Sequence, residues 1–111
     1  MNGVHEINDS QFQAEVLEAN ELVLVDFWAP WCGPYRMVAP VLEKVAAGYA
    51  GRVKVVKVNV DANQAWAGKY GVSSIPAMFF FRAGQPVDNV VGFQPEAALV
   101  QRVDKLLQPV S

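Results

Sequence analysis

Cysteine is scarce in this 111-residue sequence. Cys32 is the single cysteine, so the chain cannot form an internal disulfide bond under any redox conditions. One cysteine and one histidine, His5, also leave a structural zinc site short of ligands. We therefore expect neither a bound metal nor an organic cofactor.

An excess of charge of one sign and a long apolar run are also missing. Nine Lys and Arg stand against eleven Asp and Glu, a formal net charge of -2, with no basic run. We therefore expect no nucleic-acid partner and no anionic membrane surface. The longest apolar segment, residues 22–30, is interrupted by Asp26 and too short to cross a bilayer. Residues 1–10 are polar and unlike a signal peptide. These features predict a cytoplasmic protein, and we expect a monomer.

Apolar residues are abundant. They make up 52% of the chain, against 18% charged residues, which is enough to build one hydrophobic core. The sequence has no repeat, low-complexity stretch or linker, and its length suits one domain. We predict a single domain over residues 1–111.

Local patterns predict strands and helices in alternation, followed by a hairpin and a last helix. Apolar or alternating β-branched residues predict strands at 22–28, 53–60, 77–82 and 87–91, the last two flanking a turn at 83–86. Helical spacing and end signals predict helices after Asn8-Asp9-Ser10, over 34–49 with a kink at Pro40, over 63–70 before Gly71, and from Pro95 onward. This order indicates an α/β sandwich around a mixed sheet.

The candidate reactive residue is Cys32, in the segment that joins the buried strand at 22–28 to the long helix. We expect it at a helix N-terminus, where free amide groups and the positive end of the helix dipole favour the thiolate, the reactive form. The alternative is an inert, small apolar side chain. A loop flanked by Trp31 and Pro34 is a poor place to bury a side chain, which favours the reactive interpretation.

Several motifs give the chain a specific resemblance. Trp31-Cys32-Gly33-Pro34, followed by Arg36 and preceded by Val25–Pro30, resembles the thioredoxin active-site signature. Further matches run in order through residues 8–107: the segment around Lys57, Tyr70-Gly71-Val72, Ser74-Ile75-Pro76, Phe81–Gly84 and Val91-Gly92. The resemblance implies the thioredoxin fold, a mixed sheet of about five strands flanked by about four helices. One position departs from the family: Tyr35 stands where the second motif cysteine is expected.

By this resemblance, Cys32 is the nucleophile that forms a mixed disulfide with disulfide-containing or thiol proteins. The family's second cysteine then releases the reduced target, and Tyr35 cannot do so. The resemblance therefore predicts a thiol–disulfide exchange protein that cannot complete a dithiol cycle alone. Thioredoxin reductase or an external thiol such as glutathione are the electron donors that it implies.

Two other functions stay open. The domain could be a redox-inactive binding module or adaptor that docks proteins through the same surface, with the thiol incidental. An iron–sulfur cluster held between two chains by Cys32 is a third hypothesis, because such clusters are bound by cysteine thiolates.

The resemblance links two charged residues, Asp26 and Lys57, to proton handling. Asp26 lies in an apolar segment where an ionised carboxylate is costly to bury, so we expect its pKa to be raised. In the family the matching aspartate assists proton transfer at the second cysteine, and the lysine matching Lys57 lies nearby. With Tyr35 at that position, Asp26 is either an inherited proton handler that is now idle or a solvated or structurally paired charge.

The remaining site residues concern the surface around the thiol. The resemblance implies a cis bond between Ile75 and Pro76 across from Cys32, and a substrate-binding surface completed by Trp31, Pro34, Gly92 and Phe93. Tyr35 should lie beside Cys32, because residues three apart on a helix are neighbours. Its ring either packs inward, which we favour, or turns outward to shield the thiol or donate a hydrogen bond to it.

Overall fold

A five-stranded mixed sheet organises the chain, in a computed structural model that describes residues 3–33 and 35–109. The strands are β1 (His5–Glu6), β2 (Leu22–Trp28), β3 (Val53–Asn59), β4 (Ala77–Arg82) and β5 (Gln85–Val91). The helices are α1 (Tyr35–Gly48), α2 (Ala65–Lys69) and α3 (Glu96–Leu107), with a 3-10 turn (Asp9–Gln11) and a π-helical segment (Gln13–Leu17) before β2. The strand order β1-β3-β2-β4-β5 confirms the α/β class and the thioredoxin fold.

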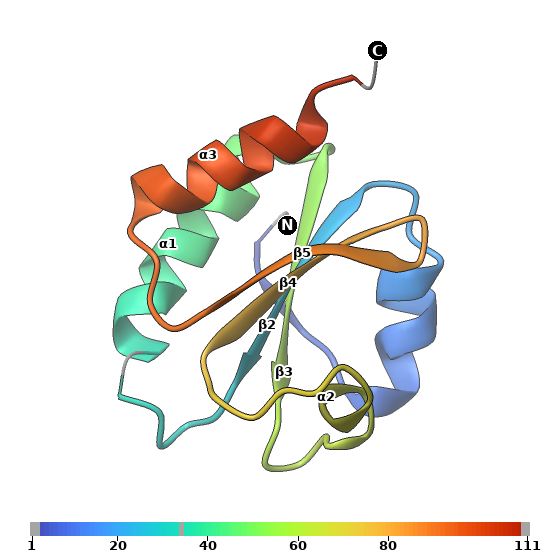
Figure 1. Ribbon diagram of the computed structural model, residues 1–111, viewed down its shortest axis with the longest axis vertical. Helices are drawn as coiled ribbons and strands as arrows, with labels where there is room; N and C mark the ends of the chain where they lie inside the picture. Colours follow the sequence, from blue (N-terminus) through green and yellow to red (C-terminus); the bar gives the residue numbers. More distant parts are fainter. Residues whose placement is uncertain (1–2, 34, 110–111) are drawn as a thin grey trace.

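The sheet separates two hydrophobic layers. Figure 1 shows α1 and α3 together on one side, and the helical segment that precedes β2 on the other. On the first side, Leu42 and Val45 of α1 and Leu99 and Val103 of α3 pack into one buried cluster. On the second side, a separate buried cluster forms around Phe12, against the opposite face of the same sheet. Apolar faces at helical spacing thus bury themselves against opposite faces of the sheet.

The central strand β2 is buried at all seven positions, as its sequence predicted. It pairs in parallel with β3 and antiparallel with β4, so its backbone groups are bonded on both edges. This register sets Asp26 beside Lys57 of β3 and Met78 of β4. The end of β2 leads directly into the loop that carries Cys32.

Several element ends match their sequence signals. Asn8 caps the first helical turn, its side chain accepting from the Gln11 backbone while Gln11 bonds back to Asn8. Pro95 precedes α3, and Gly71 after α2 has a positive φ of 71°. Pro40 lies inside α1.

The hairpin turn differs from the prediction. The turn is Ala83–Gly84 rather than residues 83–86, and β5 begins two residues earlier than expected, at Gln85. Both turn residues have positive φ, 52° and 81°, as a tight two-residue hairpin connection requires. A Cβ at Gly84 would lie 3.0 Å from the Leu17 carbonyl oxygen, which also favours glycine there. Strand β1 was not predicted, because two exposed residues carry no periodic signal.

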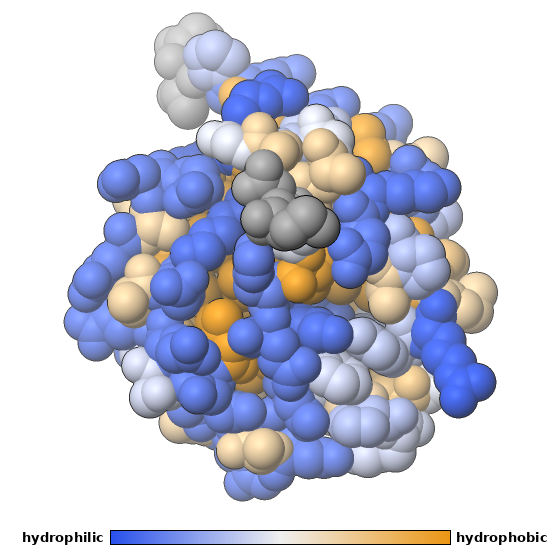
Figure 2. Space-filling view, turned by 180° about the vertical axis from the view of Figure 1, so that it is seen from behind, coloured by the Kyte–Doolittle hydropathy of each residue, from blue (hydrophilic) through white to orange (hydrophobic). Residues whose placement is uncertain are grey.

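The surface is mostly polar where Figure 2 shows it, with small apolar areas between hydrophilic side chains. Within residues 3–33 and 35–109, no helix is long and apolar enough to cross a membrane.

Candidate active site around Cys32

Cys32 lies three residues before the first residue of α1. Its N–H donates to the Ala29 carbonyl at 3.0 Å, and its carbonyl accepts from the Tyr35 N–H at 3.2 Å. The helix therefore starts from the turn that holds the cysteine, as predicted. The Cys32 residue is only 6% exposed, however, so the expectation that this loop could not bury a side chain is wrong. Its thiol lies 3.5 Å from the Ile75 carbonyl, which belongs to the loop that packs against it.

The loop opposite the thiol has the conformation that the resemblance implied. The Ile75–Pro76 peptide bond is cis, Pro76 is buried and Ile75 is half-buried. The Pro76 carbonyl accepts a hydrogen bond from Gly92 N–H at 2.7 Å, and Gly92 has a φ of 89°. The loop with the cis bond thus links two segments far from it in the sequence, bonding to Cys32 through Ile75 and to Gly92 through Pro76.

Aromatic side chains border this meeting point. Trp31 is 69% exposed, and Phe93, next to Gly92, is also exposed. The Trp31 indole N–H donates to Asp61 at 3.0 Å, which holds an exposed aromatic ring in one orientation. The sequence had not singled out Asp61, because the pairing depends on two loops meeting. Gly33 is exposed, and Pro34 lies outside the described residues.

A hollow of about 540 Å³ adjoins this surface. Trp31 and Ile75 line it together with three apolar residues, Val60, Ala67 and Val72. An apolar hollow beside a reactive group can bind an apolar side chain of another protein.

Asp26 is completely buried. Neither carboxyl oxygen has a hydrogen-bond partner among the described residues. Burial raises its pKa to about 7, and the nearby Lys57 charge opposes the rise. The expected burial is confirmed, and the alternative of a solvated strand end is excluded.

Lys57, Tyr35 and Trp28 form a trio between β2, β3 and the start of α1. The Lys57 ammonium donates to the Tyr35 hydroxyl at 2.9 Å and lies 5.0 Å from the centre of the Trp28 ring. The Tyr35 and Trp28 rings stack, with centroids 4.4 Å apart. Burial lowers the pKa of Lys57, but the hydrogen bond and electrostatic interaction with Tyr35, with smaller contributions from Glu6 and Asp26, outweigh it and raise the pKa overall.

This geometry decides between the two orientations considered for Tyr35. The ring packs, as favoured, but against Trp28 rather than deep in the core, and the residue stays half-buried. Its hydroxyl bonds to Lys57. Trp28 was missed as a site residue. The available signal was its place two residues after Asp26, at the end of the buried strand.

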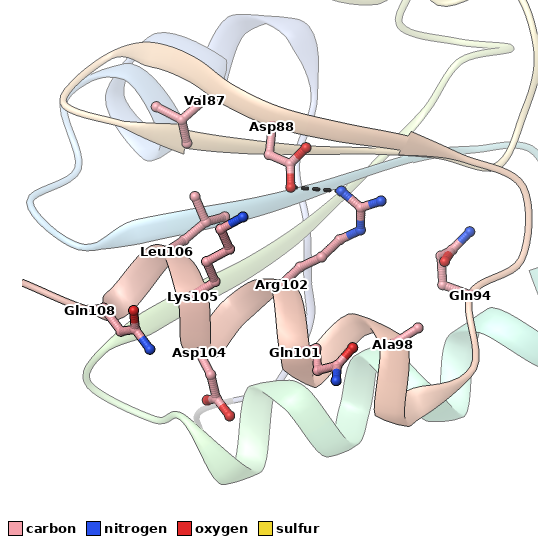
Figure 3. Close-up of a pocket in the computed structure, with 10 residues that line it drawn as sticks. All are labelled: Val87, Asp88, Gln94, Ala98, Gln101, Arg102, Asp104, Lys105, Leu106 and Gln108. Atoms are coloured by element: carbon pink, nitrogen blue, oxygen red, sulfur yellow. Dashed lines mark hydrogen bonds and ion pairs between the residues drawn. The ribbon is translucent and has the colours of Figure 1, made fainter.

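A larger groove lies between β5 and α3 (Figure 3). An ion pair of Arg102 with Asp88, 2.8 Å long, crosses it. None of the predicted site residues lines the groove. Among residues 3–33 and 35–109, no group of three or more His, Cys, Asp or Glu is placed to hold a metal ion.

Comparisons with known proteins give one consistent result. The thioredoxin family model matches residues 3–105. Thioredoxin 1 of Nostoc sp. is 51% identical over 107 residues, which cover 96% of this chain and 100% of the relative. Thioredoxin 1 of Synechococcus elongatus is 54% identical over 101 residues, covering 91% and 94%. A thioredoxin of Staphylococcus aureus is 50% identical over 101 residues, covering 91% and 95%.

Proposed function

Because this chain belongs to the thioredoxin family of thiol–disulfide oxidoreductases, we propose that it performs thiol–disulfide exchange through Cys32 alone. The observation that carries the proposal is the pairing of Cys32 with Tyr35. The only cysteine of the chain precedes α1, beside the cis Ile75–Pro76 loop. The position that would carry a resolving thiol is a tyrosine bound to Lys57.

The proposed step is attack by the Cys32 thiolate on a target disulfide. A new S–S bond forms between Cys32 and one target sulfur, and the other target sulfur leaves as a thiolate. Release of the remaining sulfur requires a second thiol. Since the chain has no other cysteine, that thiol comes from outside, and a small thiol such as glutathione has the right chemistry.

We propose that Trp31, Ile75, Pro76, Gly92 and Phe93 bind the target. The exposure of both aromatic rings and the hollow beside Ile75 support this assignment. Apolar surface next to a reactive group is typical of protein-binding sites. The targets are disulfide-containing or thiol proteins, and we expect the chain to act as a cytoplasmic monomer.

Asp26 is proposed to be an inherited proton handler that has lost its target. Its pKa of about 7 would suit proton transfer at neutral pH, and no described residue bonds to its oxygens. The thiol that it would serve is replaced by Tyr35, whose hydroxyl is engaged by Lys57. Lys57 belongs to the same group, since its charge opposes the rise in the pKa of Asp26.

The deciding experiment measures whether Cys32 reacts and whether it turns over. The rate of Cys32 alkylation is recorded against pH, and the chain is incubated with oxidised glutathione and weighed by mass spectrometry. We expect one stable glutathione adduct per chain, and repeated reduction of a protein disulfide with glutathione but not with thioredoxin reductase as sole donor. Repeated turnover with the reductase alone would refute the one-cysteine mechanism.

The second candidate is a redox-inactive binding module, favoured by the low exposure of Cys32 beside an exposed Trp31. Cys32→Ser separates the two. The substitution abolishes disulfide exchange if the thiol acts, whereas a binding module retains its partners. An unreactive thiol in the wild-type chain would give this candidate the lead.

A further inference from the structure

The burial of Cys32 leaves its sulfur little open space. The residue is 6% exposed, the Ile75 carbonyl lies 3.5 Å from Sγ, and the backbone N–H is held by Ala29. In thiol–disulfide exchange the attacking sulfur approaches in line with the S–S bond that breaks. The bond to a target therefore forms along the solvent-facing direction of Sγ, and that bond then occupies this direction.

The two sulfurs of the resulting mixed disulfide are therefore unequal. An external thiol that attacks Cys32 Sγ has to arrive opposite to the target, from the protein interior. A thiol that attacks the target sulfur arrives from solvent. In that case Cys32 leaves as a thiolate before the first turn of α1, where the helix dipole stabilises negative charge.

Tyr35 matters for the attack of an external thiol on Cys32 Sγ from the protein interior. Its ring is stacked on Trp28, which is only 9% exposed, and its hydroxyl is bound to Lys57. The side chain at this position therefore fills space with a ring that is held at both its face and its tip. It supplies no sulfur that could attack Cys32.

From this geometry, and resting on the proposed exchange function, we propose that Tyr35 and the burial of Cys32 direct the external thiol to the target sulfur. For a target R–S–S–R′, the Cys32 thiolate forms Cys32–S–S–R and releases the R′ thiolate. The glutathione thiolate then attacks the R sulfur, forming R–S–S–glutathione and freeing the Cys32 thiolate. One thiolate is consumed and one released, and one disulfide is exchanged for another, so atoms and electrons balance.

The product of such a cycle is a protein–glutathione mixed disulfide together with one free thiol. The chain thereby turns over without a second cysteine. A further thiol–disulfide exchange reaction, with a second equivalent of small thiol, has to consume the mixed disulfide. Tyr35 is a specificity-determining residue in this cycle, because it selects which sulfur is attacked.

The test follows the fate of each sulfur. Cys32 is joined to a synthetic peptide with one cysteine, using the peptide's activated aryl disulfide, so that the adduct does not depend on natural exchange. Excess glutathione is added, samples are quenched with acid at short times, and the products are weighed. We expect the initial products to favour peptide–glutathione disulfide over chain–glutathione disulfide by on the order of tenfold. Equal amounts, or an excess of chain–glutathione, would overturn the inference.

Variants assign the effect to position 35. Tyr35→Ala removes the ring three residues after Cys32, and we expect the product ratio to fall by roughly threefold or more, because the proposal makes that ring an obstacle to attack on Sγ. The matched control is Tyr49→Ala, a tyrosine just beyond the other end of α1 whose hydroxyl bonds to Asp104. We expect it to keep the wild-type ratio. An unchanged ratio in Tyr35→Ala, with native far-UV circular dichroism, would remove Tyr35 from the proposal.

The inference and the proposed function can fail separately. If wild-type Cys32 does not react with an ordinary peptide disulfide, the exchange function fails. The product ratio from the preformed adduct still shows which of the two sulfurs glutathione attacks. This measurement uses the wild-type chain and requires no variant.

Discussion

The chain contains two trios in which a lysine lies over a tryptophan and a tyrosine. We call them the site trio (Lys57, Trp28 and Tyr35) and the packing trio (Lys69, Trp66 and Tyr70). In both, the ammonium lies 5.0 Å from the indole centroid, and the two rings are nearly parallel. The same three residue types thus recur with the lysine at the same distance from the indole, although the ring centroids are 4.4 Å apart in the site trio and 6.3 Å apart in the packing trio.

In the packing trio the indole N–H is satisfied, whereas no described residue bonds to the Tyr70 hydroxyl. The Trp66 indole N–H donates to the Asp9 carbonyl at 3.0 Å, and its ring stacks on the buried Phe12 at 4.8 Å. Its lysine is exposed. These contacts close the hydrophobic layer on one face of the sheet and offer no reactive group.

The site trio lies over unsatisfied polar atoms. Among the described residues, the Trp28 indole nitrogen and both Asp26 oxygens are buried without a hydrogen-bond partner. Beside the packing trio, Oδ1 of Asp9 is also buried without a partner, but the other oxygen of that carboxylate accepts from the Ala65 N–H. Buried polar groups without partners are costly and uncommon in folded proteins. The two trios thus differ in the carboxyl group beside them: Asp26 is buried with neither oxygen bonded, whereas Asp9 has one oxygen bonded.

Among the substitutions that test the difference between the two trios, Asp26→Asn should change the free energy of unfolding most. The unfolded chain ionises this carboxyl near its ordinary pKa of 3.8, whereas burial raises the folded-state pKa to about 7. Between these values the folded state binds more protons, so stability falls as pH rises. The variant should raise the free energy of unfolding by on the order of 4 kcal/mol at pH 8 and by little near pH 4, measured by urea denaturation.

Asp9→Asn, beside the packing trio, is the matched control. The Asp9 carboxylate accepts a hydrogen bond from the Ala65 N–H, and an asparagine oxygen can keep it, so no comparable gain at pH 8 is expected. For Asp26→Asn itself, an equal gain in the free energy of unfolding at pH 4 and pH 8 would contradict the titration of Asp26. A large drop in the Cys32 alkylation rate would show that Asp26 still serves the thiol.

Replacing the lysine of each trio by methionine should have the next largest effect. Lys57→Met removes a hydrogen bond and a contact with two rings, and should lower the free energy of unfolding by roughly 1 to 2 kcal/mol at pH 4. It should also extend the decline in stability to higher pH, because the folded-state pKa of Asp26 rises further without the Lys57 charge. Lys69→Met should cost roughly 0.5 to 1 kcal/mol and leave that pH dependence in place. Identical pH profiles for the two variants would erase the distinction between the trios.

The smallest effect is expected from removing one hydroxyl group. Tyr35→Phe loses the hydrogen bond from Lys57 and should cost roughly 1 kcal/mol. Tyr70→Phe, in the packing trio, should change stability by less than about 0.5 kcal/mol, because no described residue bonds to its hydroxyl. Both are measured by thermal unfolding. The Tyr35→Phe chain should alkylate at nearly the wild-type rate, and a severalfold change would mean that the hydroxyl acts on the thiol.

Much of the fold could be predicted from local patterns. The buried strand Leu22–Trp28 and the helix that begins after Cys32 follow from the chemistry of neighbouring residues. The turn at Ala83–Gly84 was placed within two residues. Strand β1 escaped because its two residues are paired only through β3, a contact that no local pattern records.

From the residues alone it follows that there is one cysteine, that it precedes a helix, and that a carboxylate lies in a buried strand. Those facts depend on residue identity and on patterns a few residues long. The tertiary structure decided the rest: that Cys32 is almost covered, that Tyr35 bonds to Lys57, and that Trp31 pairs with Asp61. Each of these features depends on segments that are far apart in the sequence and that only the folded sheet brings together. Their contacts stabilise the chain only after the entropy of bringing those segments together has been lost.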